Sequence, residues 1–180
     1  MTIPSAFSMQ DVNNELGRTP TLAFDMNDVT VRDLAKVSLT ANSAWSMASL
    51  QGKQAGNVTV GVGFAGSLNN YGFNDGSDGG GTYGSCSPGS LLGQDVQGLK
   101  NGGSNTSLIV SLLGVLAQTF WTTLLIRTSF NSAPIARLLS SAATQFVTVG
   151  GVRSEWRYLG SSPINISAYN GQNLIFTLIK

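Results

Sequence analysis

Alternating apolar and polar positions predict β-strands over most of the chain. In residues 58–65, valine and phenylalanine alternate with threonine, glycine and alanine, as expected of a half-buried strand. Two apolar runs, 107–115 and 118–126, have the length and composition of buried strands. Residues 173–180 are apolar on both alternating faces, which predicts a strand inside the core. The regular spacing of short strands and turns predicts a mainly β domain over 56–180, folded as an antiparallel, jelly-roll-like β-sandwich.

A β-hairpin is predicted near the end of this domain. Residues 144–149 and 152–159 both have strand-like composition, and Gly150 and Gly151 lie between them. Paired glycines adopt the positive φ angles of a type I′ turn without steric cost, so we expect a two-residue turn here.

The second arm of this hairpin separates its side chains into two sets. One face carries charged residues, and the other carries Val152, Ser154, Trp156 and Tyr158. The simplest interpretation places the tryptophan in the core and the arginines in solvent. The alternative is a face that binds a sugar or phosphate group, because aromatic rings and guanidinium planes stack on such ligands. The candidate residues of that ligand face are Arg153, Trp156, Arg157 and Tyr158.

Residues 66–103 hold 12 of the 22 glycines and predict a long loop within the β domain. Asp75 and Asp78 lie in this segment, and Asp95 follows further along. Two such carboxylates could act as a catalytic acid and base, or bind a cation weakly. We favour a solvated turn, because aspartate and glycine are common turn residues and glycine-rich segments do not hold catalytic groups rigidly. We therefore predict no catalytic residue and no metal site in this segment.

The N-terminal segment, residues 1–55, contains an imperfect repeat. An aromatic residue, any residue, Met, any residue, Asp or Ser, and an aliphatic residue recur at 7–12, 24–29 and 45–50. Short helices are predicted after the first two copies. Asp11–Leu16 precedes Gly17, which suits a helix end, and Thr30 with Asp33 resembles a capping box for Val31–Val37.

Each copy of the repeat has too little apolar surface to offset the entropy of its own ordering. The segment must therefore lie on another surface, which is either the second half of the same chain or another protein. In the second case the repeat positions are docking residues, and methionine suits such contacts because its side chain adapts to irregular surfaces. The predicted docking residues are Phe7, Met9, Asp11, Val12, Phe24, Met26, Asp28, Val29, Trp45, Met47 and Leu50.

Composition removes several classes of function. The chain has no histidine, so histidine-dependent nucleophile activation and histidine metal ligation lack their central residue. Cys86 is the sole cysteine, which excludes an intrachain disulfide and a CxxC site. Ten basic residues against nine acidic ones provide no basic excess for nucleic-acid binding. We expect a non-enzymatic protein with no cofactor and no nucleic-acid partner.

Two segments bear on targeting. Residues 1–7 lack the basic and apolar regions of a secretory signal. Residues 108–126 form an uncharged run of 19 residues, long enough for a membrane-spanning helix. Gly114 divides this run into two pieces of strand length, so we favour two buried strands and expect no membrane contact.

The N-terminal motifs resemble the opening of structural proteins of tailed bacteriophages. The pattern is Phe-Ser-Met-x-Asp-Val-x-x-Glu-Leu-Gly at 7–17, Val-Arg-Asp-Leu-Ala at 31–35 and Ser-Met-x-Ser-Leu-x-Gly-Lys at 46–53. The resemblance implies a short fibre, neck or tail accessory protein that docks on the virion through its N-terminal segment. It also implies virion partners, assembly in the bacterial cytoplasm, and a homotrimer or ring. The alternative function is a glycan-binding adhesin module that uses Trp156, Tyr158 and the 71–81 loop.

Overall fold

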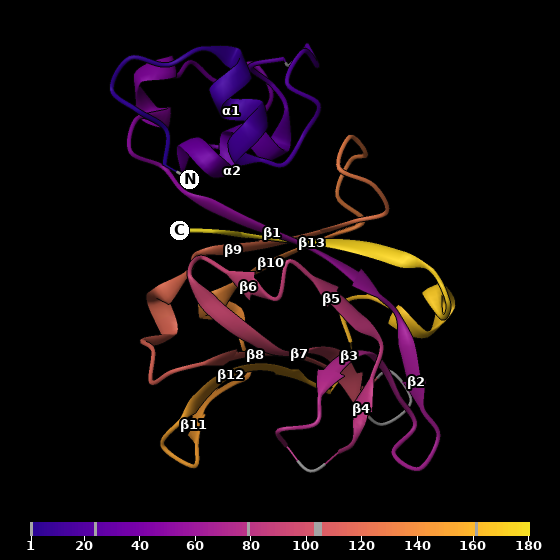
Figure 1. Ribbon diagram of the computed structural model, residues 1–180. Coiled ribbons are helices and arrows are strands. Elements are labelled where there is room, and N and C mark those ends of the chain that lie inside the picture. The colour runs from indigo at the N-terminus through magenta and orange to yellow at the C-terminus, as the bar shows by residue number, and fades with distance from the viewer. Residues whose placement is uncertain (1, 24, 79, 103–105, 161) are drawn as a thin grey trace.

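The computed structural model describes residues 2–23, 25–78, 80–102, 106–160 and 162–180. The chain is mainly β, with two antiparallel sheets that face each other and a helical segment at the N-terminus (Figure 1). The predicted fold class is therefore confirmed.

One sheet has five strands, and it lies between the helical segment and the other sheet (Figure 1). Every strand pair in it is antiparallel, and the last strand of the chain lies at its centre. Its order is β10 (Ala136–Leu139), β9 (Thr123–Arg127), β13 (Asn173–Ile179), β1 (Ala55–Gly61) and β5 (Ser85–Ser87).

The second sheet has eight strands, six of which form a continuous antiparallel path. That path runs β11 (Gln145–Val149), β12 (Arg153–Leu159), β8 (Ser107–Leu113), β7 (Gln94–Gly102), β3 (Asn70–Asp75) and β2 (Gly63–Ala65). Two short strands lie off the path: β4 (Thr82–Tyr83) pairs with β3, and β6 (Ser90–Leu91) pairs with β7.

The main core fills the space between the two sheets. Trp121 and Trp156 are both fully buried there, with ring centroids 5.4 Å apart, and Phe146 packs on Trp156 at 5.1 Å. The indole Nε1 of Trp156 donates to the Gln118 carbonyl at 2.9 Å, so this buried polar group is satisfied. The tryptophan of the hairpin is thus in the core, as the alternation predicts.

The prediction that residues 66–103 are mostly loop is wrong. They contain β3 to β7, including the nine-residue strand β7 in the middle of the larger sheet. Glycine here allows backbones to approach closely: a Cβ on Gly72 would lie 2.3 Å from the Leu99 carbonyl oxygen. The high glycine content of this segment therefore reflects closely packed strands. Rules applied to a single sequence do not distinguish such strands from a loop.

The predicted hairpin and the uncharged run both contain β-strands, but the limits of the strands differ from the prediction. Gly150 and Gly151 have φ angles of 62° and 69°, but Val149 pairs with Arg153, so the turn has three residues. The run 108–126 contains most of β8, a 3-10 turn and all of β9 except Arg127. Among the described residues, no helix is long and apolar enough to cross a membrane.

The N-terminal segment contains α1 (Met9–Glu15), α2 (Val29–Ala35) and a 3-10 helix, η1 (Met47–Leu50). Ser8 and Asp11 form a capping box at the start of α1, and Gly17 follows it with a φ of 67°. The cap predicted for the second helix is wrong: Asp28 caps α2 by accepting from the Thr30 amide at 2.8 Å. The helices therefore begin about two residues earlier than predicted.

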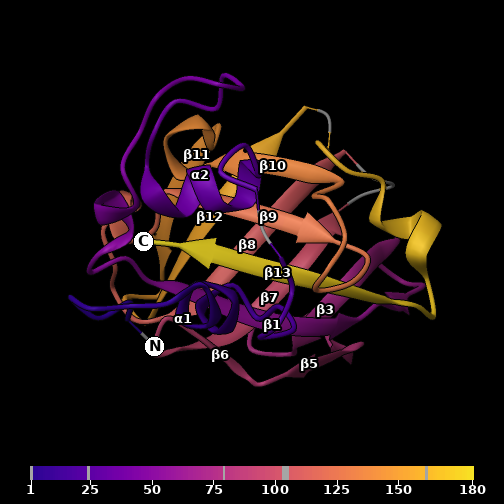
Figure 2. The ribbon, with the colours of Figure 1, turned by 90° about the horizontal axis from the view of Figure 1, so that it is seen from above.

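These helices lie on the outer face of the five-stranded sheet, α1 near β1 and α2 near β10 (Figure 2). We call residues 2–54 the helical layer. A second apolar cluster joins this layer to Leu125 of β9 and Ile179 of β13. The surface on which the N-terminal segment lies is thus the chain's own sheet. The buried members of the cluster are Ile3, Val12, Leu16, Val31, Leu34, Ala35, Leu50, Ala55, Leu125 and Ile179.

Candidate functional site

The three repeat copies share a local structure. Ser8, Asp25 and Ser46 occupy the second position of each copy, and the side-chain oxygen of each accepts a backbone N–H two or three residues on. Each copy of the repeat therefore forms a turn that is capped by the side chain at its second position. It begins helix α1 and η1 directly, and in the second copy it forms a turn before α2.

The apolar and acidic repeat positions have different environments. Val12 and Leu50 are fully buried in the second cluster, where no partner could reach them without rearrangement. Phe7, Trp45 and Met47 are half-buried and pack against the same cluster. Asp11 belongs to the capping box, Asp28 pairs with Arg18, Met26 is half-buried, and Phe24 lies outside the described residues. Met9 and Val29 remain exposed, at 54% and 40%.

Two arginines fasten the helical layer to the five-stranded sheet. Arg127 of β9 is fully buried and donates to the Leu16 carbonyl at the end of α1, at 3.1 Å. Arg137 of β10 holds Asp33 of α2 through two nitrogens, with Nε 2.7 Å from Oδ2. The bond to Asp33 raises the pKa of Arg137, whereas burial and repulsion from Arg18 lower the pKa of Arg127 to about 10. The layer is therefore held in one position by polar contacts as well as by its apolar cluster.

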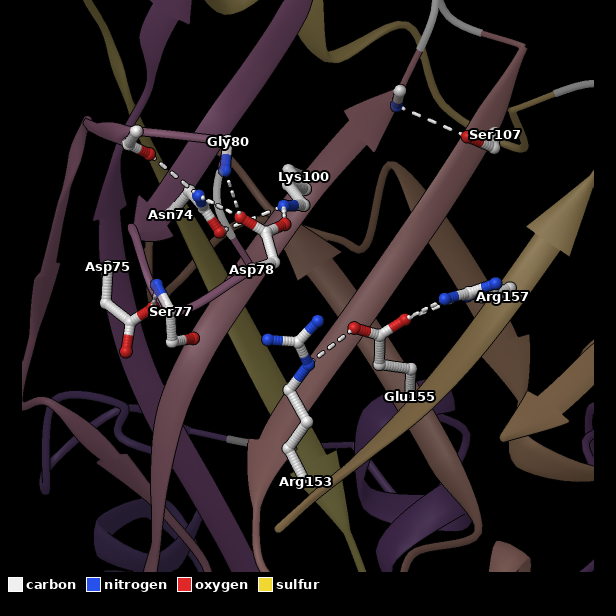
Figure 3. A network of polar contacts seen from close by, with 12 residues as sticks. Asn74, Asp75, Ser77, Asp78, Gly80, Lys100, Ser107, Arg153, Glu155 and Arg157 are labelled. Atoms are coloured by element: carbon white, nitrogen blue, oxygen red, sulfur yellow. Dashed lines mark hydrogen bonds and ion pairs between the residues drawn. The ribbon is translucent and has the colours of Figure 1, made fainter. Parts of the chain in front are cut away.

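A network of polar side chains covers the outer face of the eight-stranded sheet (Figure 3). We call it the polar face. The strand registers place Gly98, Ser111 and Glu155 in one row across three strands, with Lys100, Ile109 and Arg157 in the next. Residues paired in this way share a face, so the charged groups of β7 and β12 lie on the same face with β8 between them. The polar face consists of Asn74, Asp78, Lys100, Arg153, Glu155 and Arg157.

On one side of the polar face, Lys100 forms an ion pair with Asp78 and donates to Asn74 Oδ1 at 2.9 Å. The end of its aliphatic chain lies beside Gly98. Burial acts to raise the pKa of Asp78, but hydrogen bonds from Lys100, Asn74 and the Gly80 amide outweigh it and lower the pKa to about 2. Asp78 is therefore an ionised, paired carboxylate.

On the other side, Glu155 lies between two arginines of its own strand (Figure 3). Arg153 Nε donates to Glu155 Oε1 at 2.9 Å, and Arg157 Nη2 donates to Oε2 at 2.6 Å. Arg157 also donates to the Gln145 side chain at 3.2 Å. Arg153 and Glu155 are buried, contrary to the prediction that the charged face of this arm is in solvent. Leu113 and Val149 flank Arg153 on the two neighbouring strands, and the ion pair with Glu155 satisfies the buried guanidinium.

The predicted ligand face does not form as a unit. Trp156 and Tyr158 point into the core, where the Tyr158 hydroxyl donates to the Leu139 carbonyl at 2.7 Å. Arg153 and Arg157 lie on the opposite side of the sheet, in the polar face. An aromatic ring and a guanidinium from this strand therefore cannot stack on one ligand.

The acidic side chains Asp75 and Asp78 of residues 66–103 stabilise the fold through contacts within the chain. Asp78 accepts from Lys100, while Asp75 accepts from the Ser77 amide within its own turn at 2.9 Å. Among the residues that the structure describes, no three His, Cys, Asp or Glu side chains gather in a possible metal site. Cys86 on β5 is half-buried, and burial raises its thiol pKa to about 11.

Comparison with known proteins finds no relative of this chain. No family model, no curated protein and no solved structure matches this chain. A proposal for the function therefore rests on the geometry of the chain and on the motifs of its helical layer.

Proposed function

We propose that this chain is a non-enzymatic structural component of a tailed-phage particle, docked through its helical layer. The observation that carries the proposal is the arrangement of two different surfaces on opposite sides of one sandwich (Figure 1). The repeat motifs that resemble phage structural proteins are in the helical layer, beyond one sheet. The polar face lies on the outer side of the other sheet. A chain with this arrangement can contact the particle on one side and present the other outward.

The docking surface is smaller than the sequence predicts. Val12 and Leu50 stabilise the fold of the chain itself, so they do not insert between partner chains. Met9 and Val29, at the first positions of α1 and α2, are the exposed apolar members of the repeat. They supply the contact in this proposal, since truncation of apolar anchors in an interface has large effects on binding.

The fixed position of the helical layer favours binding. Arg127 holds the end of α1 and Arg137 holds Asp33 within α2, so the contact residues are placed before a partner arrives. A preorganised surface loses less conformational entropy on association than a flexible one.

The test is incorporation into particles of the phage that encodes the chain. Particles are purified after production with wild-type, Met9→Glu or Leu68→Glu chain, and the chain is quantified by mass spectrometry. Glutamate at the first turn of a helix is favourable for the helix, so Met9→Glu should fold. Leu68 is 45% exposed in the turn between β2 and β3, away from the helical layer, and gives a matched control.

We expect wild-type and Leu68→Glu chains in the particles, and at least a tenfold loss for Met9→Glu. Wild-type chain missing from purified particles overturns the virion proposal. Equal incorporation of all three chains leaves the virion proposal standing and overturns docking through the exposed end of α1. The glycan-binding alternative loses its two predicted aromatic contacts on β12, because Trp156 and Tyr158 are in the core.

A further inference from the structure

Strand β11 leaves one end of the eight-stranded sheet open. Among the described strands it pairs with β12 alone, so its second edge presents backbone N–H and C=O groups. The opposite end of the path is β2, a strand of three residues that begins with glycine. The end strands of the smaller sheet are also short, with four residues in β10 and three in β5. β11 is therefore the longest open edge in the described chain.

The sequence of β11 lacks the features that protect edge strands. Its five residues are Gln-Phe-Val-Thr-Val, with no charge, no proline and no glycine. Val147 and Val149 are half-buried on the outer side, and Thr148 is exposed on the other. Soluble proteins blunt an edge of this kind unless another strand covers it.

Exposed apolar side chains lie at the turn that joins β11 to β12 and at the neighbouring end of β8. Val152 and Val115 are 59% and 67% exposed, and Leu113 is 38% exposed. The amide of Gly114, between Leu113 and Val115, donates to the Val152 carbonyl at 2.7 Å, so the end of β8 is joined to the hairpin turn.

We propose that β11 pairs in an antiparallel register with β11 of a second copy of this chain, around a two-fold axis at Val147. In that register Val147 faces Val147 of the second copy, Phe146 faces Thr148, and Gln145 faces Val149. Such cross-strand pairs are favourable, and no pair places like charges together. The two arginines paired with β11 across the hairpin, Arg153 and Arg157, are both already held by Glu155.

A second copy suits this edge better than a charged partner strand. An isologous contact needs a surface that complements itself, and an uncharged strand with valine at its centre does so. The same register brings the turn at Val152 toward residues 142–143 of the second copy. The inference is independent of the virion proposal, and it gives two-fold pairing where the phage resemblance implies a trimer or ring.

The experiment measures mass in solution by analytical ultracentrifugation for wild type, Val147→Lys, Val147→Glu and their equimolar mixture. Lysine or glutamate at this position meets its own copy across the axis. Each single variant should therefore dissociate, with a dimer dissociation constant raised about tenfold or more. The mixture should form a heterodimer, because lysine then faces glutamate. Ala65→Lys on β2, at the far end of the same sheet, is the matched control and should dimerise as wild type does.

Circular dichroism establishes that each variant is folded before its mass is interpreted. A dimeric wild type, dissociated single variants and a restored heterodimer support the pairing. A wild type that stays monomeric at the highest soluble concentration overturns it. So does a wild-type oligomer of any size that Val147→Lys and Val147→Glu leave intact, and so does a mixture of the two that fails to associate.

Discussion

Arg127 and Leu16 are 111 positions apart in the chain, and a hydrogen bond of 3.1 Å from Nη2 of the arginine to the leucine carbonyl joins them. The same side chain donates to the Phe130 carbonyl at 2.7 Å and to Thr177 Oγ1 at 2.6 Å. One buried guanidinium thus joins the end of α1, the five-stranded sheet and the loop after β9. The helical layer is built into the sandwich, and the predictions below test how it is held.

Replacement of Arg127 by Met should lower the free energy of unfolding by roughly 2–4 kcal/mol, because it leaves several buried acceptors without a donor. Urea denaturation followed by tryptophan fluorescence measures the change. Lys53→Met, at a half-buried position with no hydrogen bond described for its side chain, should change stability by less than about 0.5 kcal/mol. A stability loss for Arg127→Met no larger than this control would contradict the role of the arginine.

Asp33 and Arg137 should show a coupling free energy of roughly 1–3 kcal/mol in a double-mutant cycle. Asp33 is buried, so Asp33→Asn leaves the arginine without its two-point acceptor, and Arg137→Met leaves a buried carboxylate unpaired. The double variant should be more stable than the sum of the single losses predicts. Additive losses in urea denaturation would show that the pair does not couple α2 to β10.

The ion pair of Asp78 should make stability depend on acid pH. Its pKa is about 2 in the folded chain against an ordinary value of 3.8, so the unfolded chain takes up the proton first as pH falls. The stabilisation is complete above the ordinary pKa and disappears as pH falls toward about 2.

The matching measurement is urea denaturation of wild type and Asp78→Asn between pH 6 and pH 2. The wild type should be the more stable at pH 6, and the difference should shrink progressively below pH 4. A difference that stays constant over this range would mean that Asp78 is not paired with Lys100.

Cys86 should react slowly with thiol reagents in the folded chain. The thiol pKa is about 11 against an ordinary value of 9, so the thiolate fraction at pH 8 is lower by about a hundredfold. Labelling with a chromogenic disulfide reagent, in buffer and in concentrated urea, measures the ratio of rates. Similar rates in the two conditions would show that burial on β5 does not suppress the thiolate.

The amino-acid sequence determined what depends on neighbouring residues. Alternation placed Trp156 in the core, paired glycines placed the hairpin turn, and Gly17 marked the end of α1. Each of these features follows from backbone geometry over a few residues, which is why one sequence suffices.

Only the tertiary structure decided the features that join distant segments. Glycine-rich residues 66–103 became strands because neighbouring backbones pack against them, and Arg153 and Glu155 became buried as an ion pair between two neighbouring strands. The docking repeat divided into a buried part and an exposed part because Leu125 and Ile179 lie beneath it. Strand order and the covering of a sheet face depend on contacts between residues far apart in the chain, and a local pattern carries no information about them.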